Sequence, residues 1–241
     1  MRKVLIGSPS MYGSVDVWYV NSLIETIKYN NEHNKGIEII PIWLSFDALI
    51  QRVRNDTLNV ALELECDDIV WIDTDIEWDP KWFFKLLEYP VDVVGGTYRK
   101  KGDKEEYVYR QYNKQKPNEL GLIPVDGLGT GFVRMSRKAM QYLWDVSTPY
   151  IDTKDNKERR MVFDLVIEDI DGVPSMVSED IHAFDKLRKG GFDIFLDPQM
   201  TCNHLGHYKF QGNFNDWYKS GSPMHRLTPP AIMPRKPIRQ L

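Results

Sequence analysis

The amino-acid sequence predicts an α/β fold in which helices cover both faces of a mostly parallel central sheet. Over the first hundred residues, short apolar runs of strand length alternate with longer segments whose apolar residues recur at helical spacing. Strands separated by helices pair in parallel, because each helix carries the chain back to the edge where the previous strand began. Ligands bind such sheets beyond the carboxyl ends of the strands, so we expect a site after residues 6 and 72.

Apolar periodicity and capping residues divide the first half of the chain into elements. Ser14 is expected to cap a helix through residue 27, and apolar spacing predicts a second helix over 46–64. Asp79-Pro80 begins a third helix through residue 87, because proline is favoured in a first helical turn. Strands are predicted for the apolar runs at 4–6, 37–42, 69–72 and 91–94.

The second half of the chain is less regular. Ser136 and Ser178 are expected to cap helices that end near residues 143 and 189, and residues 192–196 form the last predicted strand. We expect 98–122, which is rich in Lys, Tyr and Glu, to be an exposed hairpin or a mobile loop. The charged segment 150–160 is expected to be a loop.

Composition indicates a soluble globular chain with one main domain. The 241 residues are 42% apolar and carry a net charge of -4, so bulk charge gives no support for nucleic-acid binding. With only two cysteines, reduced thiols are expected rather than disulfides, and no stretch approaches the length of a membrane-spanning helix. We expect one domain over 1–208 and a C-terminal extension over 209–241, partly extended because its end is rich in proline and basic residues.

Asp73-Thr74-Asp75 directly follows a fully apolar predicted strand. Two carboxylates one residue apart at a strand end can both reach one hard cation, and imidazole from His204 is a frequent further ligand of such cations. The alternative interpretation is a solvated turn with two unrelated acids and a structural histidine.

Three further features carry possible chemistry. Glu179-Asp180 opens a predicted helix, where the acids either offset the helix dipole or supply a general base for an acceptor hydroxyl. The glycine cluster around Gly129 either lets backbone approach a ligand or forms a tight turn before a strand. Arg54 and Tyr12 either bind the phosphates and base of a nucleotide or belong to ordinary solvated and packed surfaces.

The acidic triplet, glycine loop, Glu-Asp pair and C-terminal histidine occur in an order that resembles the core of GT-A fold glycosyltransferases, over about residues 4 to 207. Small bacterial and phage members are closer still. The resemblance implies a single Rossmann-like α/β domain. Its motifs here are Gly7-Ser8-Pro9-Ser10, Arg54-Asn55, Trp71-Ile72-Asp73-Thr74-Asp75-Ile76, Val94-Gly95-Gly96-Thr97-Tyr98 and Ser178-Glu179-Asp180-Ile181.

The resemblance implies a role for each matching residue. Asp75 and His204 would bind Mn²⁺ or Mg²⁺, and Asp73 would hold the ribose or assist the metal. Asp180 would be the base of an inverting transfer, with Glu179 beside it on the acceptor, although retaining relatives carry a similar pair without using it as a base. The donor would be a nucleotide sugar, expected to be a UDP-sugar, bound by Ser10, Tyr12, Arg54, Asp73, Thr74 and Gly129.

The acceptor is left open between a glycan and a hydroxymethylated base in phage DNA. Some phage members of this class modify their own DNA, and the basic loop 98–122 beside an acidic body would suit phosphate contacts. The alternative is a solubilising loop. The absence of a membrane anchor from the sequence leads us to expect a cytoplasmic protein of a bacterial or phage-infected cell.

Two other function classes remain. A metal-dependent nucleotidyltransferase would also use paired acids, but the loop Ser8-Pro9-Ser10-Met11-Tyr12 lacks the basic residue that such enzymes usually carry after the first strand. A non-catalytic carbohydrate-binding or nucleic-acid-binding module could use the seven tryptophans and twelve tyrosines as stacking surfaces.

Overall fold

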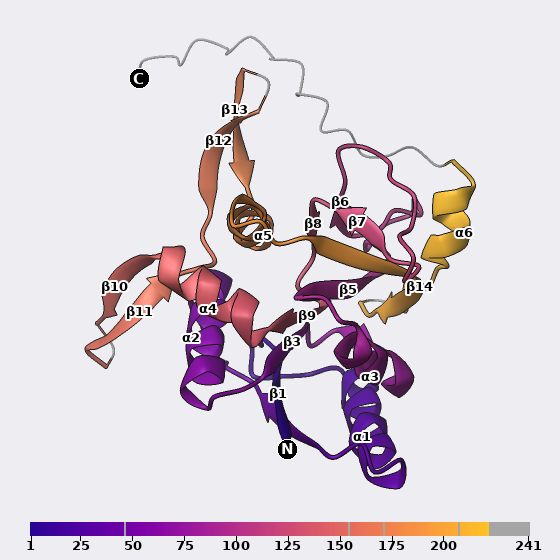
Figure 1. Ribbon diagram of the computed structural model, residues 1–241, viewed down its shortest axis with the longest axis horizontal. Helices are drawn as coiled ribbons and strands as arrows, with labels where there is room; N and C mark the ends of the chain where they lie inside the picture. Colours follow the sequence, from indigo (N-terminus) through magenta and orange to yellow (C-terminus); the bar gives the residue numbers. More distant parts are fainter. Residues whose placement is uncertain (46, 154, 171, 207, 222–241) are drawn as a thin grey trace, which may run out of the picture.

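A central sheet with helices on both sides organises the molecule (Figure 1). The computed structural model describes residues 1–45, 47–153, 155–170, 172–206 and 208–221. The strands of the central sheet are β1 (Arg2–Gly7), β2 (Ile37–Ile42), β3 (Asp68–Ile72), β4 (Ile76–Glu77), β5 (Val93–Tyr98), β7 (Ile123–Val125), β9 (Phe132–Ser136) and β14 (Ile194–His204). The helices are α1 (Val17–Glu32), α2 (Ile50–Glu63), α3 (Pro80–Glu88), α4 (Arg137–Val146), α5 (Glu179–Lys189) and α6 (Phe214–Lys219).

The sheet is mixed, with the order β2-β1-β3-β9-β5-β14-β4 and β7 beside β14. β1 is parallel to β2 and β3, and β5 is parallel to β14. β9 is antiparallel to both of its neighbours, and β4 and β7 are antiparallel to β14. The α/β class is therefore confirmed, but the expectation of a mostly parallel sheet is wrong. A strand can follow another in parallel only after a crossover connection, which is usually a helix. Residues 99–131, between β5 and β9, contain no helix.

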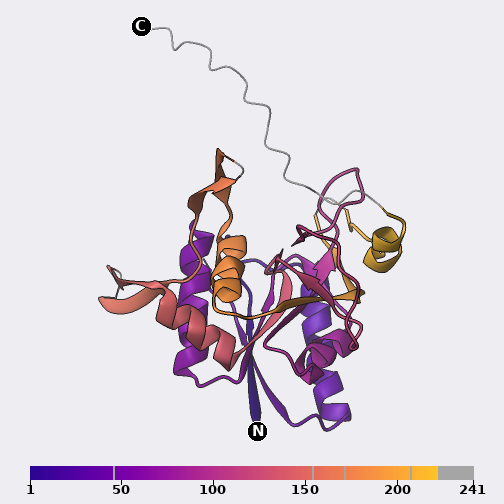
Figure 2. The same ribbon diagram turned by 45° about the horizontal axis from the view of Figure 1, so that its top comes forward.

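Alternating side chains of the central strands feed two separate hydrophobic cores. In β1, Leu5 belongs to one core, whereas Val4 and Ile6 belong to the other. In β3 the same alternation sends Trp71 to the first core and Ile72 to the second. Figures 1 and 2 show α1 and α3 on one side of the sheet and α2 and α4 on the other. The sheet is thus buried on both faces, which is why its strands are continuous apolar runs.

Helix starts agree in part with the predicted caps. Asp79 and Ser136 each accept a backbone N–H in the first turn of α3 and α4. Asp16, rather than Ser14, caps α1, because the chain turns two residues later than predicted. Ser178 occupies the cap position of α5, but its hydroxyl makes no cap bond to the backbone.

Two segments without a predicted strand form hairpins, although one of them, 150–160, is expected from the sequence to be a loop. The described residues of 150–160 lie in a hairpin of β10 (Thr148–Asp152) and β11 (Lys157–Met161), which projects beside α2 in Figure 1. A second hairpin, β12 (Val166–Ile170) and β13 (Val173–Val177), leads into α5. These strands are largely exposed and contain no long apolar run, so apolar periodicity does not reveal them.

The segment 98–122 is anchored to the body. Its strand β6 (Tyr109–Arg110) pairs with β8 (Gly127–Leu128), and the Tyr107 ring is buried against Phe214 of α6. The antiparallel bridge between Arg99 and Tyr107 agrees with the expected hairpin, but the burial of Tyr107 shows that this part of the segment is not fully exposed. The polar sequence around these aromatic residues predicts that they are exposed. In the fold they pack against α6, which is distant in the sequence.

The C-terminal segment packs on the domain as far as it is described. Phe214 and Tyr218 of α6 belong to the first hydrophobic core. Most of the predicted extension 209–241 lies outside the described residues, which end at 221. Cys66 and Cys202 are both buried and free, as expected. Among the described residues, no helix combines the length and apolarity needed to cross a membrane.

Candidate functional site

The short strand β4 brings the acidic triplet to the end of β14. Asp73 follows β3 directly, and the chain turns through Thr74 and Asp75 into β4. In the β4–β14 register Ile76 lies opposite His204, and the N–H of Leu205 donates to the carbonyl of Asp75 at 2.8 Å. This pairing places the predicted histidine beside the predicted aspartate, although they lie far apart in the sequence.

The His204 ring presents one nitrogen to Asp75. Its Nδ1 lies 2.9 Å from the carbonyl oxygen of Arg99, which can only accept, so Nδ1 carries the hydrogen. In the neutral ring Nε2 is then an acceptor, and it lies 3.5 Å from Oδ2 of Asp75. Two acceptors at this separation suit two ligands of one cation, and a carbonyl partner on the other nitrogen is the usual second contact of a metal-binding histidine. Asp75 and His204 could therefore supply two of the ligands of a divalent cation.

A lysine shares the same carboxylate. Nζ of Lys101 lies 2.5 Å from Oδ2 of Asp75. Burial favours a higher pKa of the Asp75 carboxyl, but the hydrogen bonds from Lys101 and from the protonated form of the His204 ring outweigh it and lower the pKa below its ordinary value. The described residues hold no group of three acidic, histidine or cysteine side chains arranged for one metal. Asp73, the third predicted ligand, has a different partner.

Asp73 faces Arg54 of α2. Nη2 of Arg54 lies 3.3 Å from Oδ1 of Asp73, and Nη1 donates to Oε1 of Glu179 at the start of α5. Burial raises the pKa of the Asp73 carboxyl, with Arg54 opposing this effect and Asp75 and Asp180 adding to it. Arg54, predicted to contact the donor, thus lies in the site between two carboxylates.

Asp180 caps its own helix. Its Oδ1 accepts the hydroxyl hydrogen of Ser178 at 2.5 Å and the backbone N–H of Ile181 at 2.7 Å. These bonds explain why Ser178 makes no cap bond of its own. They also fix the orientation of the Asp180 carboxylate at the amino end of α5, where the helix dipole favours negative charge.

The predicted nucleotide-contacting residues divide into two groups. Ser10 and Thr74 line a pocket of about 270 Å³ beside the acidic triplet, which Asp73 and Asp75 also line. Tyr12 is 75% exposed and is not among the lining residues of that pocket. Gly129 is buried, and a Cβ there would lie 2.5 Å from the hydroxyl of Tyr98, so packing alone accounts for a glycine.

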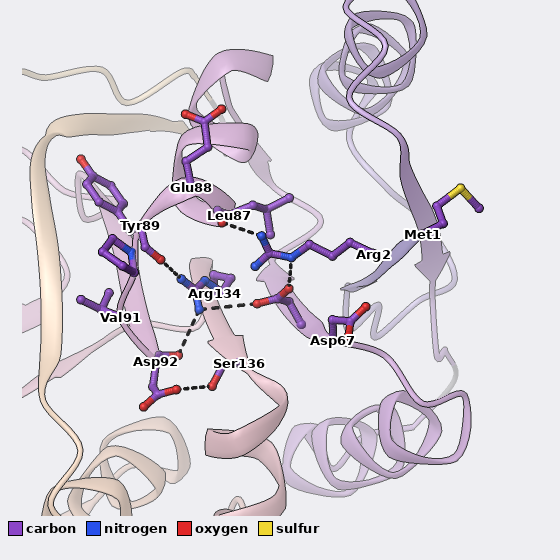
Figure 3. A pocket seen from close by; sticks show the side chains of 12 residues that line it. Met1, Arg2, Asp67, Leu87, Glu88, Tyr89, Val91, Asp92, Arg134 and Ser136 are labelled. Carbon is purple, nitrogen blue, oxygen red and sulfur yellow. Dashed lines mark hydrogen bonds and ion pairs between the residues drawn. The ribbon is translucent and has the colours of Figure 1, made fainter.

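A larger pocket, of about 730 Å³, lies at the opposite end of the strands, beside the amino ends of β1 and β3 (Figure 3). Its walls include Arg134, which donates to the carbonyls of Leu86 and Tyr89, and Arg2, which pairs with Asp68 at 2.6 Å. These arginines hold the end of α3 to the sheet. The acidic triplet and His204 lie at the carboxyl ends of β3 and β14, away from this pocket.

For two residues of the site, the sequence gives no signal for the contacts that they make. Lys101 is one of several basic residues in 98–122, and nothing in its spacing marks it as the partner of Asp75. Tyr98 is buried behind the glycine cluster, where its hydroxyl accepts the N–H of Gly131 at 3.2 Å. Only the ordered base of that segment places both side chains.

Comparisons with known proteins support the fold. No family model and no curated protein matches the sequence. Among solved structures, the crystal structure of A197 from STIV superposes with a TM-score of 0.54 at 18% identity, over 86% of each chain. A glycosyltransferase involved in the glycosylation of the major capsid of PBCV-1 aligns over 58% of this chain and 62% of its own, with 12% identity and a TM-score of 0.34. At this identity the likeness to A197 concerns the fold alone.

Proposed function

We propose that this protein is a metal-dependent glycosyltransferase that moves a sugar from a nucleotide-sugar donor, a UDP-sugar, to an acceptor hydroxyl. One observation carries the proposal: three segments that are remote in the sequence converge on the acidic triplet, and the triplet itself lines a pocket. They are Arg54 of α2, the Glu179-Asp180 pair of α5 and His204 of β14. Their charges act on Asp73, and Ser10 and Thr74 also line the pocket.

The proposed roles follow from the side-chain chemistry. Asp75 and His204 would hold Mn²⁺ or Mg²⁺, and the cation would neutralise charge on the departing diphosphate. Ser10 and Thr74 would contact the nucleotide from the pocket wall. The Asp180 carboxylate would accept the acceptor's hydroxyl proton, which gives an inverting transfer, while Glu179 is held in place by Arg54.

A glycan is the better-supported acceptor. Arg99 donates to the carbonyls of Gly102 and Asp103, and Lys100 pairs with Glu106 at 3.4 Å. These bonds and the Lys101–Asp75 pair engage three basic side chains of the loop within the molecule. A hydroxymethylated base in DNA remains the second acceptor to test, because Lys104 adds a further positive charge to the loop.

A donor screen tests the proposal. Purified protein is incubated with a panel of nucleotide sugars, and release of the nucleoside diphosphate is measured with Mn²⁺, with Mg²⁺ and with chelator. We expect metal-dependent release from a UDP-sugar, increased by a glycan acceptor or by hydroxymethylated DNA. Asp75→Ala should abolish release while the protein stays folded. Pyrophosphate release from a nucleoside triphosphate would instead indicate a nucleotidyltransferase.

A further inference from the structure

Side-chain cations already neutralise both aspartates of the acidic triplet. Arg54 contacts Asp73 and Glu179, and its side chain is only 5% exposed. Lys101 contacts Asp75, and its side chain is 38% exposed. A buried arginine held by two carboxylates cannot leave without exposing both of them, whereas a half-exposed lysine with one partner can move into solvent at little cost.

The loop that carries Lys101 is ordered at its base. The N–H of Lys100 donates to the carbonyl of Glu106 at 2.7 Å, and the N–H of Val108 donates to the carbonyl of Tyr98 at 3.1 Å. The aliphatic stem of Lys101 passes over Gly206, where a Cβ would lie 3.4 Å from its Cδ. The ordered base of the loop therefore places the Lys101 ammonium next to Asp75. Rotation about the side-chain bonds of Lys101 is enough to move the ammonium away from Asp75.

We propose that Lys101 is the built-in counter-ion of the metal site and that a divalent cation must displace it from Asp75. This inference rests on the proposed function. Oδ2 of Asp75 faces both Nζ of Lys101 and Nε2 of His204, so ammonium and metal need the same oxygen. A cation bound at about 2.1 Å from that oxygen would lie next to the Lys101 ammonium, and the two positive charges would repel each other.

Displacement couples the cation to the donor. A free cation must push the ammonium into water, where it gains no new partner. A cation that arrives with a nucleoside diphosphate brings phosphate oxygens that can take the ammonium as their counter-ion. Lys101 thus weakens binding of the cation alone and favours its binding together with the donor.

Direct binding of Mn²⁺, measured by isothermal titration calorimetry on the full-length protein at low ionic strength, tests the displacement. Lys101→Met keeps the stem and removes the charge. We expect it to bind Mn²⁺ about two- to fivefold more tightly than the unmodified protein, the range for loss of a half-exposed ion pair. Lys100→Met removes the neighbouring charge, whose partner is Glu106, and should change the affinity less.

Two further measurements complete the test. Asp75→Asn should remove the binding in both the unmodified and the Lys101→Met backgrounds, and thermal melts should show that every variant is folded. Addition of UDP should increase Mn²⁺ affinity more in the unmodified protein than in Lys101→Met. Equal Mn²⁺ affinity in Lys101→Met and the unmodified protein would overturn the displacement, and equal enhancement by UDP would overturn the coupling.

This experiment separates the inference from the proposed function. Metal-dependent release of UDP with no change of Mn²⁺ affinity in Lys101→Met would overturn the role of Lys101 and leave the glycosyltransferase proposal intact. Tighter Mn²⁺ binding by Lys101→Met without turnover of any nucleotide sugar would support the role of Lys101 and contradict the proposed activity.

Discussion

Arg54 joins two parts of the protein that are remote in the sequence. It lies on α2 and contacts Asp73 after β3 and Glu179 at the start of α5. Burial opposes its positive charge, but Asp73 and Glu179 outweigh burial and raise the pKa of the guanidinium further. The residue is therefore a structural support of the acidic centre, whatever it contacts when a donor is bound.

Replacement of Arg54 should destabilise the fold. Arg54→Met leaves two carboxylates without their counter-ion, one of them largely buried, and we expect it to lower the free energy of unfolding by about 3 kcal/mol. Arg52→Met is the control on the same helix, because the Arg52 side chain is 35% exposed and pairs with Asp47, and its loss should cost less than about 1 kcal/mol. Urea denaturation measures both, and equal stability of the two variants would contradict the prediction.

Lys186 should make stability depend on pH in the alkaline range. Its Nζ donates to the carbonyls of Met161 and Val162 at 2.7 and 2.9 Å, and burial lowers its pKa to about 8 from 10.5. Between these values the unfolded chain binds a proton that the folded chain has released, so stability rises with pH. Relative to Lys186→Met, the free energy of unfolding should increase from pH 8 to pH 10 and stay level below pH 8. A difference that is constant across denaturation curves at pH 7, 8, 9 and 10 would argue against this shift.

At the scale of elements, the turn between β8 and β9 packs its backbone against a tyrosine. A Cβ at Gly131 would lie 2.5 Å from the ring and hydroxyl of Tyr98, which is 5% exposed. Glycine here serves close packing, and the same contact orders the segment that follows β5. The Tyr98 ring also meets His204, with centroids 5.0 Å apart, so this packing reaches the site.

Gly131→Ala should therefore destabilise the protein by about 1–3 kcal/mol, the usual cost of overpacking a core. Gly102→Ala is the control, since a Cβ at Gly102 meets nothing within 4 Å. That variant should change stability by less than about 0.5 kcal/mol. Thermal denaturation measures the melting temperatures of the two variants. A Gly131→Ala variant with the same melting temperature as the unmodified protein would show that Tyr98 moves aside freely.

At the scale of the whole molecule, the sheet separates two cores. Ile69 and Ile72 lie in one strand but belong to different hydrophobic clusters, whereas Trp71 and Phe163 share a cluster with ring centroids 5.3 Å apart. Side chains without shared neighbours contribute independently to stability, and side chains in contact do not. The division should therefore be measurable.

Double-mutant cycles test this division. Ile69→Val and Ile72→Val should each cost about 0.5–1.5 kcal/mol and add to within about 0.5 kcal/mol in the double variant. Trp71→Phe and Phe163→Leu should show a coupling of more than about 0.5 kcal/mol, because the two rings touch. Urea denaturation gives all the values, and strong coupling between the two isoleucines would mean that the cores act as one.

The sequence by itself determined the local features of this protein. The apolar run of β3, the start of α3 at Asp79-Pro80 and the cap of α4 at Ser136 follow from periodicity and capping, which act over a few residues. The resemblance carried by the order of the acidic triplet, the Glu-Asp pair and His204 also indicated which residues meet.

Only the tertiary structure decided which charges pair and which way β9 runs. The Lys101–Asp75 and Arg54–Glu179 contacts join residues whose separation depends on strand order, and β9 is antiparallel because no helix lies between it and β5. The hairpins β10–β11 and β12–β13 escaped prediction because their strands are largely exposed and contain no long apolar run. Such features depend on long-range packing and on solvent exposure, which local periodicity does not encode.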